Sequence, residues 1–160
     1  MAKITPFLWF DTEGEDAAKF YVSVFPNSRI IRTTHYEGAI AEASGRPVGL
    51  VMTVDFELDG NPFTALNGGT MYKITEGISF SVPCRDQAEI DHYWNAFASD
   101  GGEELACGWV KDKFGVCWQV DPAEMGTWMS DPVTGPRVAE AMLTMVKLDY
   151  DALKRAYEGK

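Results

Sequence analysis

The sequence lacks the features that mark several large classes of protein. It has only three cysteines in 160 residues and no C-x-x-C pair, so neither a disulfide-stapled domain nor a closed zinc site is indicated. No apolar run is long enough to cross a membrane. The apolar run 6–10 is too short for a signal-peptide core, and acidic residues follow it. We therefore expect a cytoplasmic protein with no membrane partner.

Positive charge is also scarce. Lys and Arg number 14 against 24 Asp and Glu, which gives a net charge of −10. A field of this sign repels phosphate backbones and the basic residues are scattered, so we expect no nucleic-acid partner. The hydrophobic fraction of 46% excludes a disordered chain, and the length fits one domain.

The first half of the chain alternates strand and helix signals. Thr12 and Glu15 have the spacing of a capping box, which predicts the start of a helix. Pro26 ends that helix, and Asp59-Gly60-Asn61 predicts a hairpin turn. The expected strands are 3–10, 29–36, 50–58 and 62–67. The segment 37–47, rich in glycine, alanine and glutamate, is expected to be a loop.

The second half repeats this order. Asp86 and Glu89 again have the capping spacing, and strands are expected over 78–82, 105–110 and 116–120. The first helix matches the second at an offset of 72 residues, and the hairpins match at an offset of 54. The pattern predicts an α+β fold with two tandem β-α-β-β-β modules.

These modules define the expected organisation of the chain. Residues 1–72 form the first module, 73–125 the second, and 126–160 a helical tail, all within one compact domain. Apolar spacing in the tail predicts two short helices separated near Asp149.

Several strings carry a resemblance to a known family: FYVSVFPNSRI, VDFELDGNPFTALNGG, YKITEGISFSV, CGWVKDKFGVCWQVDP and RVAEAMLTMVKLDYDALKRAY. With the paired modules, they resemble the PhnB-like branch of the vicinal-oxygen-chelate superfamily. That superfamily includes glyoxalase I, extradiol dioxygenases and bleomycin-resistance proteins. The resemblance implies half-barrel modules that face each other across a pocket, and a homodimer in which modules can pair across subunits.

The resemblance also locates the positions where metal-dependent members place His and Glu ligands. Carried over one at a time, these positions fall at Thr5 or Pro6, Ala65, Gly77 or Ile78, and Gln119. A glutamine is a neutral oxygen donor and a poor anchor alone. We therefore expect a small-molecule ligand but no tightly bound metal and no cofactor.

Gln119 is the leading candidate for a pocket residue, because the resemblance points its side chain into the half-barrel. Strand alternation puts Cys117 on the same face, and in the first module it puts Phe63, Ala65 and Asn67 on one face. Gln119 and Asn67 could orient a polar ligand by hydrogen bonds. The alternative is that Gln119 bonds to neighbouring backbone inside a filled core.

Other candidates depend on residue type. His35 is the histidine best placed for a general base; the alternative is an exposed residue at a strand end. His92 aligns with Phe20, which predicts partial burial or a subunit contact. Trp9 could sandwich a flat ligand or pack in a core or dimer interface. The turn Lys111-Asp112-Lys113 could supply a cation for an anionic ligand or be merely solvated.

Three functions stay open. The leading hypothesis is a small-molecule-binding protein without a tightly bound metal, with or without proton transfer by His35 and Gln119. The second is a divalent-metal-dependent lyase or isomerase that uses His35, Gln119 and Glu76 as non-standard ligands. The third is a structural dimer module with a vestigial pocket.

Some members of this branch carry a demethylubiquinone methyltransferase label. Most methyltransferases cradle their cofactor on a glycine-rich turn between a strand and a helix. Gly68-Gly69 follows a strand, but no helix start comes after it. We therefore expect no methyl transfer from this chain.

Overall fold

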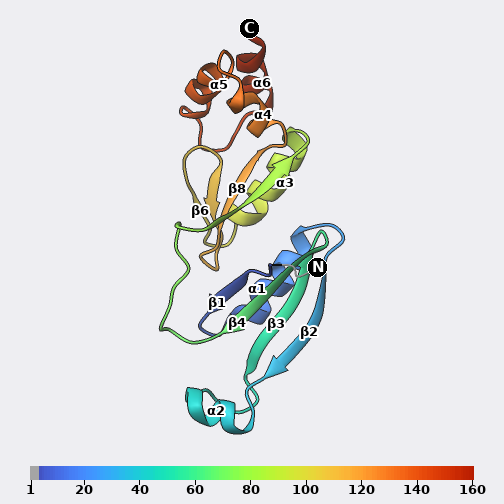
Figure 1. Cartoon of the computed structure of the whole chain (residues 1–160), viewed down its shortest axis with the longest axis vertical. Helices are drawn as coiled ribbons and strands as arrows, with labels where there is room; N and C mark the ends of the chain where they lie inside the picture. The colour runs from blue at the N-terminus through green and yellow to red at the C-terminus, as the bar shows by residue number, and fades with distance from the viewer. Residues whose placement is uncertain (1–3) are drawn as a thin grey trace. The chain divides into compact units, whose positions relative to one another are not determined.

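The computed structural model describes residues 4–160 and divides the chain into two units, Met1–Ile74 and Thr75–Lys160. Each unit contains one four-stranded sheet, and Figure 1 shows both sheets with their helices. The predicted α+β class with two β-α-β-β-β modules is confirmed. Lys3, the first residue of the first predicted strand, lies outside the described residues.

The first unit has the element order expected of the first module, with one helix added. Its elements are β1 (Phe7–Phe10), α1 (Gly14–Val24), β2 (Arg29–His35), α2 (Gly38–Ser44), β3 (Val51–Leu58) and β4 (Asn61–Asn67). We call its sheet, with strand order β1-β4-β3-β2, the first sheet. β1 runs parallel to β4, while the other neighbours are antiparallel.

The hairpin between β3 and β4 is confirmed. Its two turn residues, Asp59 and Gly60, have φ values of 46° and 78°. Positive φ at both positions matches the right-handed twist of the flanking strands, which is why Asp-Gly is a strong hairpin signal.

The predicted loop 37–47 was wrong, because its centre forms the helix α2. The run Gly-Ala-Ile-Ala-Glu-Ala-Ser holds three alanines, and alanine has the highest helix propensity. Gly45 then ends the helix in a left-handed conformation with φ 67°.

The second unit repeats the β-α-β-β-β order. Its sheet elements are β5 (Ser79–Cys84), α3 (Gln87–Ala98), β6 (Glu103–Glu104), β7 (Trp109–Lys111) and β8 (Cys117–Pro122). We call its sheet, with strand order β5-β8-β7-β6, the second sheet. The predicted cap of α3 is confirmed, because the Asp86 carboxylate accepts the Glu89 N–H at 3.0 Å.

The continuous strand predicted over 105–110 was wrong. Strand structure stops at Glu104 and resumes at Trp109, because Cys107 and Gly108 take positive φ values of 61° and 82°. Their N–H groups donate to the carbonyls of Met145 and Val146 in the tail rather than to a strand.

The two short helices predicted on either side of Asp149 are confirmed as α5 (Gly135–Met142) and α6 (Tyr150–Glu158), and a third helix that was not predicted, α4 (Met125–Ser130), precedes them. They enclose a small core of their own around Trp128, Val138 and Leu153. Asp149 caps α6 by accepting the Ala152 N–H at 2.8 Å. Among the described helices, none has the length and apolar character needed to span a bilayer.

Candidate functional site

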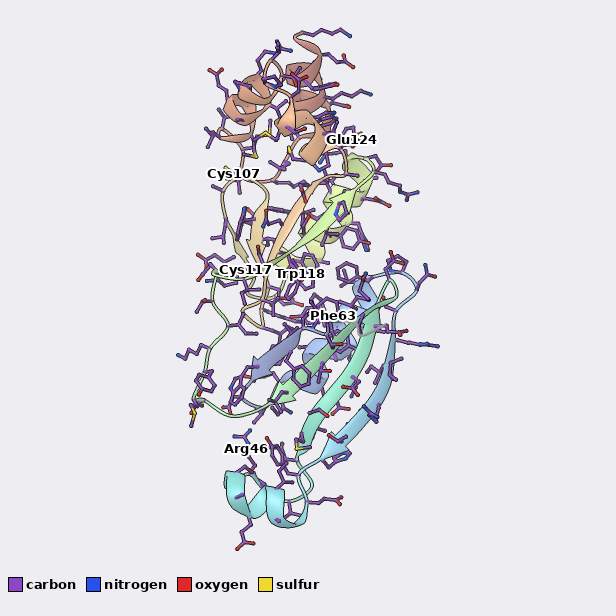
Figure 2. All side chains as sticks on the ribbon, viewed as in Figure 1. Arg46, Phe63, Cys107, Cys117, Trp118 and Glu124 are labelled. Carbon is purple, nitrogen blue, oxygen red and sulfur yellow. The ribbon has the colours of Figure 1, made fainter. Side chains whose placement is uncertain are left out.

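A helix covers one face of each sheet: α1 covers the first sheet and α3 covers the second. We call the opposite face of each sheet its open face. In the first sheet, Tyr21 of α1 stacks on Phe56, and Phe56 stacks on Phe63, with ring centroids 6.2 and 5.6 Å apart. In the second sheet, Phe97 of α3 stacks on Trp118, with ring centroids 4.5 Å apart. Figure 2 labels Phe63 and Trp118 among the side chains of the two sheets. Because side chains alternate along a strand, these contacts fix which residues belong to which face.

The structure places Phe63, Ala65 and Asn67 together, as alternation predicted, but on the face that α1 covers. Ala65 and Asn67 are 1% exposed, and a Cβ on Gly14 of α1 would lie 3.3 Å from the Ala65 Cβ. The offset of 54 residues pairs Ala65 with Gln119, but Ala65 lies on the covered face of its sheet and Gln119 on the open face of the other. The alignment of β4 with β8 must therefore be shifted by one residue.

The role of Phe63, Ala65 and Asn67 in ligand binding stays a prediction.

Asn67 uses both ends of its side-chain amide inside the first unit. Its Oδ1 accepts the Gly14 N–H at 2.7 Å, and its Nδ2 donates to the Val51 carbonyl at 3.0 Å. Its backbone carbonyl accepts the Tyr36 hydroxyl at 2.8 Å. These bonds tie β4 to α1, β3 and the segment after β2.

Trp9 lies on the open face of the first sheet. Its indole N–H donates to the Gly69 carbonyl at 2.7 Å, and the Tyr72 ring meets it edge-on at 4.9 Å between centroids. Tyr72 and the neighbouring Phe7 are 61% and 63% exposed. The three rings give this part of the sheet an aromatic surface.

The two histidines are both exposed in the structure. His35 ends β2, opposite Val51 and just after a register shift in the strand pairing. His92 lies on α3 with its ring 4.9 Å from the ring of Tyr93. The expected partial burial of His92 is therefore not seen within its unit.

The open face of the second sheet is polar. It carries Ser79 and Ser81 from β5 and Gln119 and Asp121 from β8. The Gln119 amide nitrogen donates to the Ser79 hydroxyl at 2.8 Å, and the Ser81 hydroxyl donates to Asp121 at 3.1 Å. Burial raises the pKa of the Asp121 carboxyl above its usual range, although the hydrogen bond from Ser81 acts in the opposite direction.

Cys117 shares the face of Gln119, as predicted, but its side chain is fully buried. Burial raises the pKa of the Cys117 thiol, and it raises that of Cys84 to about 12. Since the thiolate is the reactive form, neither thiol is prepared to act as a nucleophile at neutral pH.

The cations at the turn before β8 are paired within the second unit. Lys111 forms ion pairs with Glu76 and Glu103, and Lys113 lies 3.4 Å from an Asp100 oxygen. Between them, Asp112 is 3% exposed and accepts the indole N–H of Trp118 at 2.8 Å. Asp112 therefore organises the turn from inside.

The donor set does not fit the metal that metal-dependent relatives of this fold hold. Ala65 has no donor and lies beneath α1, while Gln119 is hydrogen-bonded to Ser79. Glu76, a non-standard ligand candidate, is engaged by Lys111. Over residues 4–160, no group of three His, Cys, Asp or Glu side chains is arranged to hold a metal ion.

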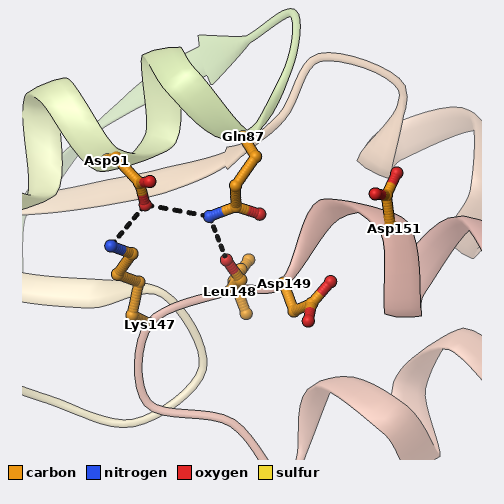
Figure 3. Close-up of a pocket in the computed structure, with 6 residues that line it drawn as sticks. All are labelled: Gln87, Asp91, Lys147, Leu148, Asp149 and Asp151. Atoms are coloured by element: carbon orange, nitrogen blue, oxygen red, sulfur yellow. Dashed lines mark hydrogen bonds and ion pairs between the residues drawn. The ribbon is translucent and has the colours of Figure 1, made fainter.

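A groove that the sequence did not predict lies beside α3 and the start of α6 (Figure 3). It encloses about 400 Å³ and is lined by Gln87, Asp91, Lys147, Leu148, Asp149 and Asp151. Gln87 donates to Asp91 at 3.0 Å and to the Leu148 carbonyl at 3.2 Å, and Lys147 pairs with Asp91. These bonds join α3 to the tail, which accounts for the polar lining.

Comparison with known proteins gives a family match. The family model described as 3-demethylubiquinone-9 3-methyltransferase matches residues 2–121. No curated protein matches the chain.

Solved structures match the fold. A putative 3-demethylubiquinone-9 3-methyltransferase, PhnB protein, from Bacillus cereus is 30% identical, with a TM-score of 0.65, and the match covers 74% of this chain and 98% of that one. A Pseudomonas aeruginosa protein is 20% identical over 76% of this chain and 98% of that one, with a TM-score of 0.60. The fosfomycin resistance protein FosX from Listeria monocytogenes is 11% identical over 76% and 90%, with a TM-score of 0.52. The last two show the fold alone.

Proposed function

The chain belongs to the PhnB-like family, whose model is described as 3-demethylubiquinone-9 3-methyltransferase, and on that premise we propose that it is a small-molecule-binding protein without a tightly bound metal. The proposed ligand site is the open face of the second sheet. Gln119 carries the proposal: it is only partly buried there, and its amide nitrogen donates to Ser79, the one hydrogen bond that its side chain makes among residues 4–160. A held amide with its other groups unused can orient a polar ligand.

The donor chemistry supports binding without a metal. A tightly bound divalent metal needs several anionic or imidazole ligands at one place. The open face of the second sheet offers Gln119 and the two serines, which are weak neutral donors, and two carboxylates, of which Glu103 is paired with Lys111 and Asp121 is held by Ser81. We therefore route no chemical step through a metal.

The family model's name does not lead us to propose methyl transfer. Gly68 and Gly69 follow β4, and no helix begins between Gly69 and Gly77. A Cβ on Gly68 would lie 2.3 Å from the Trp9 ring, so the close indole explains this glycine. Methyltransferases of the common type hold their cofactor where a strand is followed by a glycine turn and then a helix. The element after Gly68-Gly69 is the strand β5, so this order is not found here.

We propose a homodimer as the working assembly, on the family resemblance. His35 belongs to the first unit and Gln119 to the second, and we assign them no joint proton-transfer step.

Native mass spectrometry of the full chain as purified tests this function. We expect a metal-free dimer with a retained small mass in the wild type and in Asn95→Ala, which removes an exposed amide from α3. Gln119→Ala should lose that mass. A metal retained in stoichiometric amount after chelator treatment, or a ligand that Gln119→Ala still holds, would contradict the proposal.

If the purified protein carries no extra mass, a fragment screen by NMR replaces the retained ligand. We expect at least one class of small molecule to perturb the amides of β5 and β8, and Gln119→Ala to weaken it. A screen in which no fragment reaches this face would favour the structural dimer module.

A further inference from the structure

The side chains on the open face of the second sheet are linked in a regular pattern. Ser81 lies directly opposite Gln119 in the strand register, and Pro83 lies opposite Asp121. Each β8 side chain nevertheless bonds to the serine one pair earlier: Gln119 to Ser79 and Asp121 to Ser81. The Ser81 hydroxyl holds one Asp121 oxygen, so the carboxylate has a defined direction.

Asp121 has no counter-ion of its own among residues 4–160. In the part of the chain that is described, no Lys, Arg or His forms an ion pair with it. Lys111, the cation on the same sheet, is engaged by Glu76 and Glu103. Removing an ionised carboxylate from water without a partner is costly, and the raised pKa of Asp121 reflects that cost.

An aromatic side chain lies opposite Gln119, the residue two positions before Asp121 on the same face. Trp109 of β7 is directly opposite Gln119 in the register and is partly exposed. Cross-strand partners share a face of the sheet, so its indole flanks Gln119 on the side away from β5. An indole attracts a cation placed over its ring.

We propose that the open face of the second sheet recognises the protonated amine of a small organic ligand, with Asp121 as its counter-ion and Trp109 and Gln119 as its neighbours. This inference rests on the proposed function and deepens it by naming the charge of the ligand. The net charge of −10 favours cations in the same direction. It stands against the alternative in which the turn Lys111-Asp112-Lys113 supplies a cation for an anionic ligand, because both lysines are paired.

Three matched probes test the charge preference on the full chain: benzylammonium chloride, benzyl alcohol and sodium benzoate at one ionic strength. Amide chemical shifts of β5 and β8 report binding. We expect benzylammonium to bind at least tenfold more tightly than benzyl alcohol, and benzoate to bind least.

Two variants locate the effect. Asp121→Asn is nearly isosteric and keeps an oxygen for the Ser81 hydroxyl, and it should weaken benzylammonium at least tenfold while leaving benzyl alcohol unchanged. Asp151→Asn removes an exposed carboxylate of the same unit and should change neither. A melting temperature for each variant separates loss of binding from loss of fold.

The inference is overturned if benzoate binds best, if no probe shifts β5 and β8, or if Asp121→Asn binds benzylammonium as well as the wild type. The proposed function is judged separately by the retained mass and by Gln119→Ala. A neutral or anionic ligand lost in Gln119→Ala, together with an unaffected Asp121→Asn, would keep the proposed function and remove the amine.

Discussion

The side-chain oxygen of Asn67 accepts a hydrogen bond from the Gly14 N–H at 2.7 Å, so the last residue of β4 caps the first turn of α1. The predicted capping box of Thr12 and Glu15 was wrong for this reason. Glu13 at the N-cap of α1 makes no hydrogen bond from its side chain to the helix. The Gly14 N–H is instead satisfied by Asn67 from the strand β4. A free N–H at a helix start needs an acceptor, and its origin in the chain does not matter.

Asn67→Ala should destabilise the protein by about 2–3 kcal/mol. The reason is that the Gly14 N–H and the Val51 carbonyl lose their hydrogen-bond partner while they remain shielded from water. Urea denaturation followed by circular dichroism measures the loss. Asn61→Ala is the matched control, because Asn61 is exposed in the hairpin. Equal midpoints for Asn67→Ala and Asn61→Ala would contradict the capping role.

Gly14→Ala should lower stability although alanine is the better helix former. The new Cβ would lie 2.7 Å from Asn67 Oδ1, which must move and lose the cap. Gly126→Ala in α4 meets nothing within 4 Å and should raise stability by up to about 1 kcal/mol. Thermal melts of the two variants should shift in opposite directions, and a shared direction would argue against the close contact.

Asp112→Ala should cost about 3 kcal/mol or more. The buried carboxylate accepts the N–H groups of Phe114 and Val116 as well as the Trp118 indole, and all three would be left in the protein interior. Asp100→Asn serves as the control, because it removes only the charge of an exposed ion pair with Lys113 and asparagine tolerates the φ of 53° at this position. Chemical denaturation of both variants measures the loss in free energy of unfolding. A loss at Asp112 as small as that at Asp100 would mean that water replaces the three hydrogen bonds.

Thiol chemistry should single out Cys107. Cys84 and Cys117 are buried with raised pKa values, whereas Cys107 is partly exposed in the turn before β7. At pH 8 the native protein should react with a disulfide reagent at Cys107 only, and the unfolded protein at all three cysteines. Cys107→Ser should abolish the native reaction. Rapid native labelling of Cys117 would restore it as a candidate nucleophile.

Asp121→Asn should raise the melting temperature of the ligand-free protein at pH 7, by about 1–3 °C. The folded-state pKa of Asp121 is raised, so this group stabilises the fold only below its unfolded pKa of about 4, and loses that contribution as pH rises through the folded value. The difference between variant and wild type should therefore shrink at pH 3. A larger benefit at pH 3 than at pH 7 would contradict the sign.

Local signals in the sequence predicted local structure. Asp59-Gly60 formed its turn and Asp86 capped its helix, because in both cases the partner groups lie within four residues, whereas the first turn of α1 takes its cap from Asn67, 53 residues away. The β7 boundary was missed because Cys107 and Gly108 bond to the distant tail. No pattern within a short window contains that partner.

For the candidate site, too, sequence reasoning succeeded where it needed only neighbouring residues and failed where it needed distant ones. Alternation correctly placed Cys117 with Gln119, and carried one step further it would have added Asp121. The face of β4 was misplaced because it depends on α1 crossing the sheet and on the parallel pairing of Phe7 with Thr64. Composition and spacing hold no information on that crossing.

The parallel pairing of β1 with β4 also sets the order of events while the chain is made. Leu8 pairs with Ala65, so β1, the first strand of this sheet to be synthesised, stays unpaired until β4, the last strand of the sheet, has been made. The β3–β4 hairpin, closed by Asp59 and Gly60, can form within microseconds of its own synthesis. Pairing β4 with β1 is then a late step, and it carries the largest entropic cost of loop closure in this sheet. Until that step occurs, the apolar segment Phe7–Phe10 is unpaired and accessible to a chaperone.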